Sequence, residues 1–124
     1  MMREHPFGHG RVAYVQIPAI DVNASAAFYQ DTFGWQIRGG SASHLSFSDA
    51  TDNVIGAFVT GRNVSDDPGI ILYIYVHGID ATLDQIKAAG RAVVKEPYRE
   101  GDVWVATVFD PAGNVIGIWQ FAPR

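Results

Sequence analysis

The segment Asn53-Val54-Ile55-Gly56-Ala57 is nearly repeated 61 residues later as Asn114-Val115-Ile116-Gly117-Ile118. An aspartate, Asp49 or Asp110, lies four residues ahead of the asparagine in each copy. The segments between the copies also follow one order, a strand-like run and then a helix-like run that ends at glycine. A fixed internal period is typical of a duplicated supersecondary unit. If the chain holds two copies of one unit, the cleft where they meet is the natural place for a functional site.

The composition describes a folded chain that uses no cysteine chemistry. The 124 residues fit one domain, and the contents of 48% hydrophobic and 18% charged residues are those of globular proteins. The sequence has no cysteine, which excludes disulfides, thiolate metal sites and cysteine nucleophiles. This composition fits a reducing compartment, and we expect a cytoplasmic protein.

Charge and hydropathy argue against two classes of partner. The net charge is −4 and no cluster of Lys and Arg is present, so we expect no nucleic acid binding. The longest apolar run, residues 70–76, is far shorter than the roughly 20 residues that span a bilayer, so we expect no membrane insertion. The first ten residues lack the apolar core of a signal peptide and predict a flexible polar arm, residues 1–10.

The first half of the chain predicts a strand, a helix and three strands. The run 12–17 is rich in β-branched and aromatic residues and stops at Pro18. Asp21 or Asn23 can cap a helix that ends before Gly34, and its apolar residues recur with helical spacing. The three strand-like runs that follow, separated by turn residues, are 35–38, 44–48 and 54–60.

The second half predicts the same order after a polar linker, residues 61–69. Its first run, 70–76, is continuously apolar, which indicates a strand covered on both faces. Asp80 is expected to cap a helix that ends at Gly90. The charged segment 95–102 is expected to form the solvated end of a hairpin, with a lid as the alternative. The last three strand-like runs are 93–95, 103–109 and 115–121.

The fold expected from these runs is α+β, with two βαβββ units at residues 11–60 and 70–121 in a single domain, residues 1–124. A ferredoxin-like βαββαβ chain is the alternative, because short apolar runs are weak evidence for strands.

Several strings resemble those of the vicinal oxygen chelate superfamily, which includes glyoxalase I, extradiol dioxygenases and bleomycin-resistance proteins. The strings are Phe28-Tyr29, separated by three residues from Phe33-Gly34-Trp35, and the turn Asp110–Ile116. The resemblance covers residues 12–121 and is nearest to small bacterial glyoxalase-like proteins. It implies two tandem units whose curved mixed sheets enclose a cavity, and it implies a homodimer.

In metal-using members of that superfamily, His, Gln or Glu ligands come from the first and the last strand of each unit. Carried over by resemblance, these positions fall on Tyr14, Ile71, Gly56 and Gly117. Three of them have no ligating side chain, and a divalent ion needs several convergent ligands. We therefore expect no metal and no cofactor. The two glycines are expected to enlarge the cavity.

Strand alternation then sorts which side chains face the cavity and which face the helices. The expected cavity is rich in aromatic rings with one amide, and its predicted ligand-binding residues are Tyr14, Gln16, Gly56, Phe58, Ile71, Tyr73, Tyr75, Trp104, Gly117 and Trp119. Such a lining suits a flat or amphipathic organic molecule. The alternative is that these aromatic side chains fill the core or a dimer interface.

Histidine is the residue type best suited to acid–base chemistry near neutral pH. His77 shares the alternation of Tyr75 and is the candidate catalytic residue, although a turn residue is the simpler interpretation. His5 and His9 belong to the polar arm, and His44 opens a strand.

Two functional hypotheses follow. The first is a metal-free protein of the bleomycin-resistance type that binds a small organic ligand. The second is a glyoxalase-like lyase or isomerase, with unidentified metal ligands or with metal-free chemistry through His77, Tyr73 or Tyr14. A third possibility is an interaction module whose aromatic face is buried in a dimer.

Overall fold

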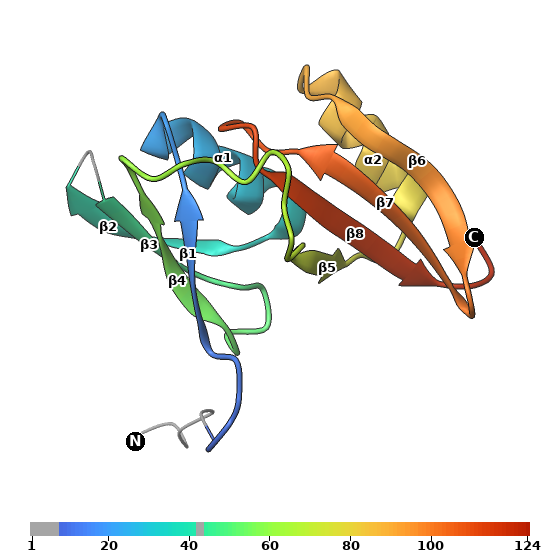
Figure 1. Cartoon of the computed structure of the whole chain (residues 1–124), viewed down its shortest axis with the longest axis horizontal. Helices are drawn as coiled ribbons and strands as arrows, with labels where there is room; N and C mark the ends of the chain where they lie inside the picture. Colours follow the sequence, from blue (N-terminus) through green and yellow to red (C-terminus); the bar gives the residue numbers. More distant parts are fainter. Residues whose placement is uncertain (1–7, 42–43) are drawn as a thin grey trace.

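In the computed structural model, which describes residues 8–41 and 44–124, one strand, one helix and three strands follow each other twice (Figure 1). The first unit contains β1 (Tyr14–Pro18), α1 (Val22–Phe33), β2 (Gln36–Ser41), β3 (His44–Ser48) and β4 (Ile55–Val59). The second contains β5 (Tyr73–Tyr75), α2 (Ile79–Ala88), β6 (Val93–Glu100), β7 (Val103–Phe109) and β8 (Val115–Phe121). Most of the predicted polar arm lies outside the described residues.

Each unit forms its own four-stranded sheet, in the order β1-β4-β3-β2 and β5-β8-β7-β6. In each sheet the first strand is parallel to the last one and the other neighbours are antiparallel. The two units lie side by side, and α1 and α2 lie on the same side of the molecule (Figure 1). The prediction of two βαβββ units in an α+β fold is confirmed, and the βαββαβ alternative is wrong.

Local signals fix the ends of α1. The Asp21 side chain accepts a hydrogen bond from the backbone N of Ala24 at 3.2 Å, so Asp21 is the N-cap. Gly34 ends the helix at φ 73°, a left-handed conformation that glycine adopts at low cost. The sequence predicts both the cap at Asp21 and the end at Gly34.

Several local predictions for the second unit are wrong. The expected strand 70–76 is too long, because β5 contains only Tyr73–Tyr75. One face of β5 is open, because Tyr73 and Tyr75 are 40% and 48% exposed. The N-cap of α2 is Gly78, and Asp80 lies in the first turn of the helix. The expected strand 93–95 extends to Glu100 as β6, so the charged segment forms the exposed end of the β6–β7 hairpin, as the sequence predicts.

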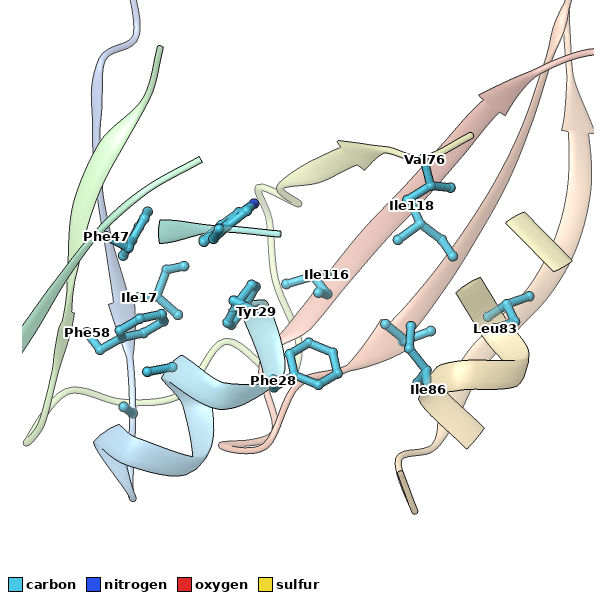
Figure 2. Close-up of a cluster of buried hydrophobic side chains, with 14 of the residues drawn as sticks. Ile17, Phe28, Tyr29, Phe47, Phe58, Val76, Leu83, Ile86, Ile116 and Ile118 are labelled. Atoms are coloured by element: carbon cyan, nitrogen blue, oxygen red, sulfur yellow. The ribbon is translucent and has the colours of Figure 1, made fainter. Parts of the chain in front are cut away.

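The hydrophobic core lies between the helices and the sheets (Figure 2). In the first unit it is an aromatic stack in which Trp35 lies 4.6 Å from Tyr29 and 4.7 Å from Phe47, measured between ring centroids. In the second unit it is aliphatic, with Leu83 and Ile86 of α2 against β8. Neither helix of the described residues has the length and apolarity needed to cross a bilayer.

Candidate functional site

The face of the second sheet that points away from α2 carries an aromatic cluster. The register of β5 and β8 sets Tyr73 beside Gly117 and Tyr75 beside Trp119, while Ile74 and Ile118 face the helix. Residues at paired positions of neighbouring strands project from the same face. The side chains of Tyr73, Tyr75 and Trp119 therefore share one face, which we call the open face of the second sheet.

The rings of this open face contact one another at one end of the sheet. The ring centroid of Trp119 lies 5.0 Å from that of Tyr75 and 4.9 Å from that of Phe121, both in edge-to-face geometry. His77 extends the cluster, with its ring 5.8 Å from Tyr75. Tyr75 is 48% exposed and Phe121 is 61% exposed. Sequence analysis missed Phe121, although strand alternation from Trp119 would have found it.

A polar group borders the same face on β6. Tyr98 pairs with Val105 of β7, and the ammonium of Lys95 lies 3.9 Å from the centre of its ring. The pKa of Tyr98 is raised, first by desolvation and then by the charges and hydrogen bonds of Tyr73 and Glu100. The open face therefore offers stacking rings at one end and phenol, carboxylate and ammonium groups beside them.

The open face of the first sheet is less aromatic. Tyr14 is 54% exposed and Gln16 is also exposed, while Val15 and Ile17 face the core. The two sheets share no paired strand in the described part of the chain, so Tyr14 and Tyr73 belong to separate faces. Ile71 precedes β5 and is half-buried.

Two predicted cavity residues face the core instead. Phe58 is fully buried, pairs with Ile17 and lies 5.6 Å from the ring of Tyr29. Trp104 packs against the core on the α2 side of the second sheet, where the guanidinium of Arg124 lies 4.8 Å from its ring. The prediction that these two side chains line the cavity is wrong.

The two glycines of the repeated segment do not enlarge a cavity. A Cβ at Gly56 would collide with the ring of Phe47 and with the carbonyl oxygen of Val15. A Cβ at Gly117 would collide with the ring of Tyr73. Each glycine leaves room for an aromatic ring that fills the space, so that prediction is also wrong.

The glycines lie on opposite faces because the turns before β4 and β8 differ by one residue. The backbone N of Asp49 donates to the carbonyl of Val54, whereas that of Asp110 donates to the carbonyl of Asn114. A shift of one residue moves every side chain of a strand to the other face. The residue of the first unit that corresponds to Gly117 is therefore Ala57, which pairs with Gln16 as Gly117 pairs with Tyr73.

The four positions that correspond to metal ligands do not fit a metal ion. With the corrected register they are Tyr14, Ala57, Ile71 and Gly117, which offer one phenol among them. Within residues 8–41 and 44–124, no group of three or more His, Cys, Asp or Glu residues could hold a metal. A divalent ion needs several N or O ligands that converge, so these positions support no metal-assisted step.

The other histidines add nothing to this site. His9 is exposed in a turn near the N-terminus. His5 and the side chain of His44 lie outside what the structure describes.

The structure also contains a pocket that sequence analysis missed. It has a volume of about 240 Å³ and lies at the seam between the two units. One wall comes from the first unit's core, at Val15, Phe33, Trp35 and Phe47. The other wall comes from residues 72–75, and the rim is formed by the turn that starts at Asp49. Only tertiary packing brings these segments together, so periodicity gave no signal for it.

Comparison with protein families places this fold among known relatives. Residues 11–118 match the family model described as the Glyoxalase/Bleomycin resistance protein/Dioxygenase superfamily. The chain belongs to this superfamily. The match runs from before β1 to Ile118 in β8, so it includes parts of both βαβββ units.

Two individual relatives are also similar in sequence to this chain. The chain is 25% identical over 128 residues to "Putative glyoxylase CFP32" of Mycobacterium tuberculosis, covering 97% of this chain and 49% of that protein. It thus spans about half the length of the curated relatives that it matches first. It is 30% identical over 89 residues to a glyoxylase-like domain-containing protein of Didymella fabae, covering 66% of this chain and 70% of that protein.

Solved structures confirm the fold. A glyoxalase/bleomycin resistance protein/dioxygenase family enzyme from Burkholderia phytofirmans superposes with a TM-score of 0.73 at 22% identity, covering 90% of this chain and 98% of that one. TnmS3, an antibiotic-binding protein from Streptomyces, superposes with a TM-score of 0.71 at 22% identity, covering 94% and 99%. An enzyme and an antibiotic-binding protein therefore share this architecture, and the side chains of each site must distinguish their functions.

Proposed function

We propose that this protein binds a small aromatic or amphipathic molecule without metal, as proteins of the bleomycin-resistance type do. The observation that carries the proposal is the half-exposed cluster of Tyr75, Trp119 and Phe121 on the open face of the second sheet. Tyrosine and tryptophan rings combine a large apolar surface with a polar tip, which suits flat ligands that carry polar groups. The relationship to TnmS3 supports the proposal at the level of the fold.

The residues at the four positions that correspond to metal ligands also support binding without metal. None of Ala57, Ile71 and Gly117 can coordinate a metal ion through its side chain, so the polar groups near the rings are suited to orienting a ligand. Tyr73, Tyr98 and Glu100 interact through their side chains at the edge of the face. They offer donors and acceptors to the polar end of a ligand whose ring stacks on Tyr75 or Trp119.

A second copy of the chain would complete the binding cavity. Tyr14, Tyr73 and Tyr75 are 54%, 40% and 48% exposed in one chain, and Phe121 is 61% exposed. Large exposed aromatic side chains on the open faces of both sheets mark an interaction surface. Sedimentation equilibrium at micromolar concentration should give a homodimer, and Phe121→Asp should shift it toward monomer. A wild-type protein that stays monomeric at several hundred micromolar would contradict the dimer.

Ligand binding can be tested with a matched pair of tryptophan variants. Trp119 and Trp104 lie on neighbouring strands but on opposite faces of the sheet. Titration with Nile red and with a panel of flat aromatic antibiotics should quench Trp119 emission in the Trp35→Phe/Trp104→Phe protein. Trp119→Leu should lose at least tenfold in affinity, whereas Trp104→Phe should keep it. Equal affinities in both variants would exclude the open face as the site.

The alternative function is that of a glyoxalase-like lyase or isomerase that uses metal-free acid–base chemistry. The specific observation in its favour is that His77 is exposed and its ring contacts Tyr75, at the end of the aromatic cluster. An imidazole beside a bound ligand can serve as a general acid or base. Turnover of the hemithioacetal of methylglyoxal that survives chelation and is lost in His77→Ala would favour this function over binding alone.

A further inference from the structure

The seam pocket has aromatic walls and one strand edge. Trp35 and Phe47, which form its inner wall, are stacked with their ring centroids 4.7 Å apart and their planes inclined by 22°. Residues 72–75 form the opposite wall. The pocket holds about 240 Å³. An apolar cavity of roughly 150 Å³ is enough to bind benzene, so this volume accommodates one aromatic ring and a short polar arm.

The strand at the pocket has hydrogen-bonding groups without a partner strand. β5 is an edge strand and pairs with β8 alone in the described part of the chain. The N of Gly117 donates to the Leu72 carbonyl at 2.8 Å, and the N of Val76 donates to the Trp119 carbonyl at 2.9 Å. Since backbone groups alternate in direction along a strand, those of Tyr73 and Tyr75 point to the free edge.

The charges around the pocket select against anions. Its lining contains no Lys or Arg, and its ionised group is the carboxylate of Asp49. That carboxylate is largely occupied by its own turn, since Oδ1 accepts from the N of Asn53 at 2.8 Å and Oδ2 accepts from Thr51 Oγ1 at 2.8 Å. It therefore repels an anionic ligand without being free to hold a cation firmly.

We propose that the seam pocket, which shares strand β5 with the open face but lies against the core of the first unit, is a second binding site for a neutral flat aromatic amide. The ring packs against Trp35 and Phe47. The amide N–H and C=O pair with the free backbone groups of Tyr73 and Tyr75, as an added strand would. An unpaired buried amide is costly, so the backbone edge selects an amide over an apolar arm of the same shape.

The pair 2-phenylacetamide and phenylacetate tests this proposal, because the two molecules share a shape and differ in charge and donors. On uniformly ¹⁵N-labelled protein, 2-phenylacetamide should shift the amide signals of Tyr73 and Tyr75 and the indole signal of Trp35. A Kd on the order of 1 mM is expected for a ligand of this size. Phenylacetate should bind at least tenfold more weakly. Equal affinity for both compounds would overturn the proposal.

The three tryptophans distinguish this site from the open face. Trp35 borders the seam pocket, whereas Trp119 lies on the open face and Trp104 on the helix side of the second sheet. Shifts confined to Trp119 would show that the compound binds the open face and would overturn the seam site. Failure of the proposed function would instead appear as unchanged Trp119 emission with the antibiotic panel, so the two failures are separable.

A pair of substitutions completes the test. Ala50 is exposed at the rim of the pocket, so Ala50→Trp should block the entrance without disturbing the core. Ala81 is exposed on α2, and Ala81→Trp makes the same change away from the pocket. Binding of 2-phenylacetamide should be lost in the first variant and kept in the second. If Ala50→Trp does not fold, Leu72→Phe narrows the pocket from the other wall. Unchanged affinity in the folded rim or wall variant would overturn the proposal.

Discussion

The hydroxyl of Tyr29 donates a hydrogen bond of 2.8 Å to Oδ2 of Asp110, and both residues are buried. Tyr29 belongs to α1 of the first unit and Asp110 to the turn between the last two strands of the second. The same carboxylate accepts from the backbone N of Ala112 and Asn114, each at 2.9 Å, and from the Asn114 side chain. A buried charge is tolerated when it is paired in this way, and here the pairing joins the two units.

Tyr29→Phe should lower the free energy of unfolding by about 1.5–3 kcal/mol, because a hydrogen bond to a buried charged group is lost while the ring remains. Urea denaturation at pH 7 measures the change. Tyr14→Phe is the control, since Tyr14 is 54% exposed. It should stay within about 0.5 kcal/mol of the wild type. Equal effects of the two substitutions would contradict a stabilising role for the Tyr29–Asp110 bond.

The same pair predicts how stability depends on alkaline pH. The pKa of Tyr29 is raised well above its ordinary value, first by burial and then by the charge and hydrogen bond of Asp110. Above pH of about 10 the unfolded chain loses a proton that the native Tyr29 retains, so stability falls by up to about 1.4 kcal/mol per pH unit. Below that pH the group contributes no slope. Urea unfolding between pH 9 and about 11 should show a shallower decline in Tyr29→Phe.

Gly117→Ala should destabilise the protein by about 1–3 kcal/mol, because the new methyl group collides with the ring of Tyr73. Most of this cost should vanish in a Tyr73→Ala background, which a double-mutant cycle of unfolding free energies measures. Gly69→Ala is the control, since no heavy atom lies within 4 Å of its added Cβ. A cost that is independent of Tyr73 would show that Gly117 is required for another reason.

The two asparagines of the repeated segment should respond differently to alanine. The side chain of Asn114 is buried, donates to the Pro18 carbonyl at 2.8 Å and accepts from the N of Ser65 at 2.8 Å. Asn114→Ala should cost about 2–4 kcal/mol, because these polar partners remain buried without it. The exposed side chain of Asn53 bonds only to Thr51 among the described residues, so Asn53→Ala should cost about 0.5 kcal/mol or less. Thermal and urea denaturation of both variants compares them.

Much of the fold could be predicted because its signals are local. The cap at Asp21, the left-handed glycine at Gly34 and the apolar spacing of α1 all lie within one helix. The candidate site was harder, because it depends on which face each strand presents. Strand alternation predicts the shared face of Tyr73, Tyr75 and Trp119, but its prediction for Phe58 is wrong because the repeated segment presents opposite faces in the two units.

The sequence by itself determined the number, order and type of the elements, because helical and strand periodicity and turn chemistry act over a few residues. Tertiary structure decided which faces the glycines occupy and where the pockets lie. The turn from Asp49 to Val54 is one residue longer than that from Asp110 to Asn114. The side chains of the repeated segment therefore point to opposite faces in β4 and β8. The seam pocket exists only because residues 72–75 pack beside the core of the first unit. Contacts between segments so far apart in the chain are set by packing of the whole molecule, which no local pattern encodes.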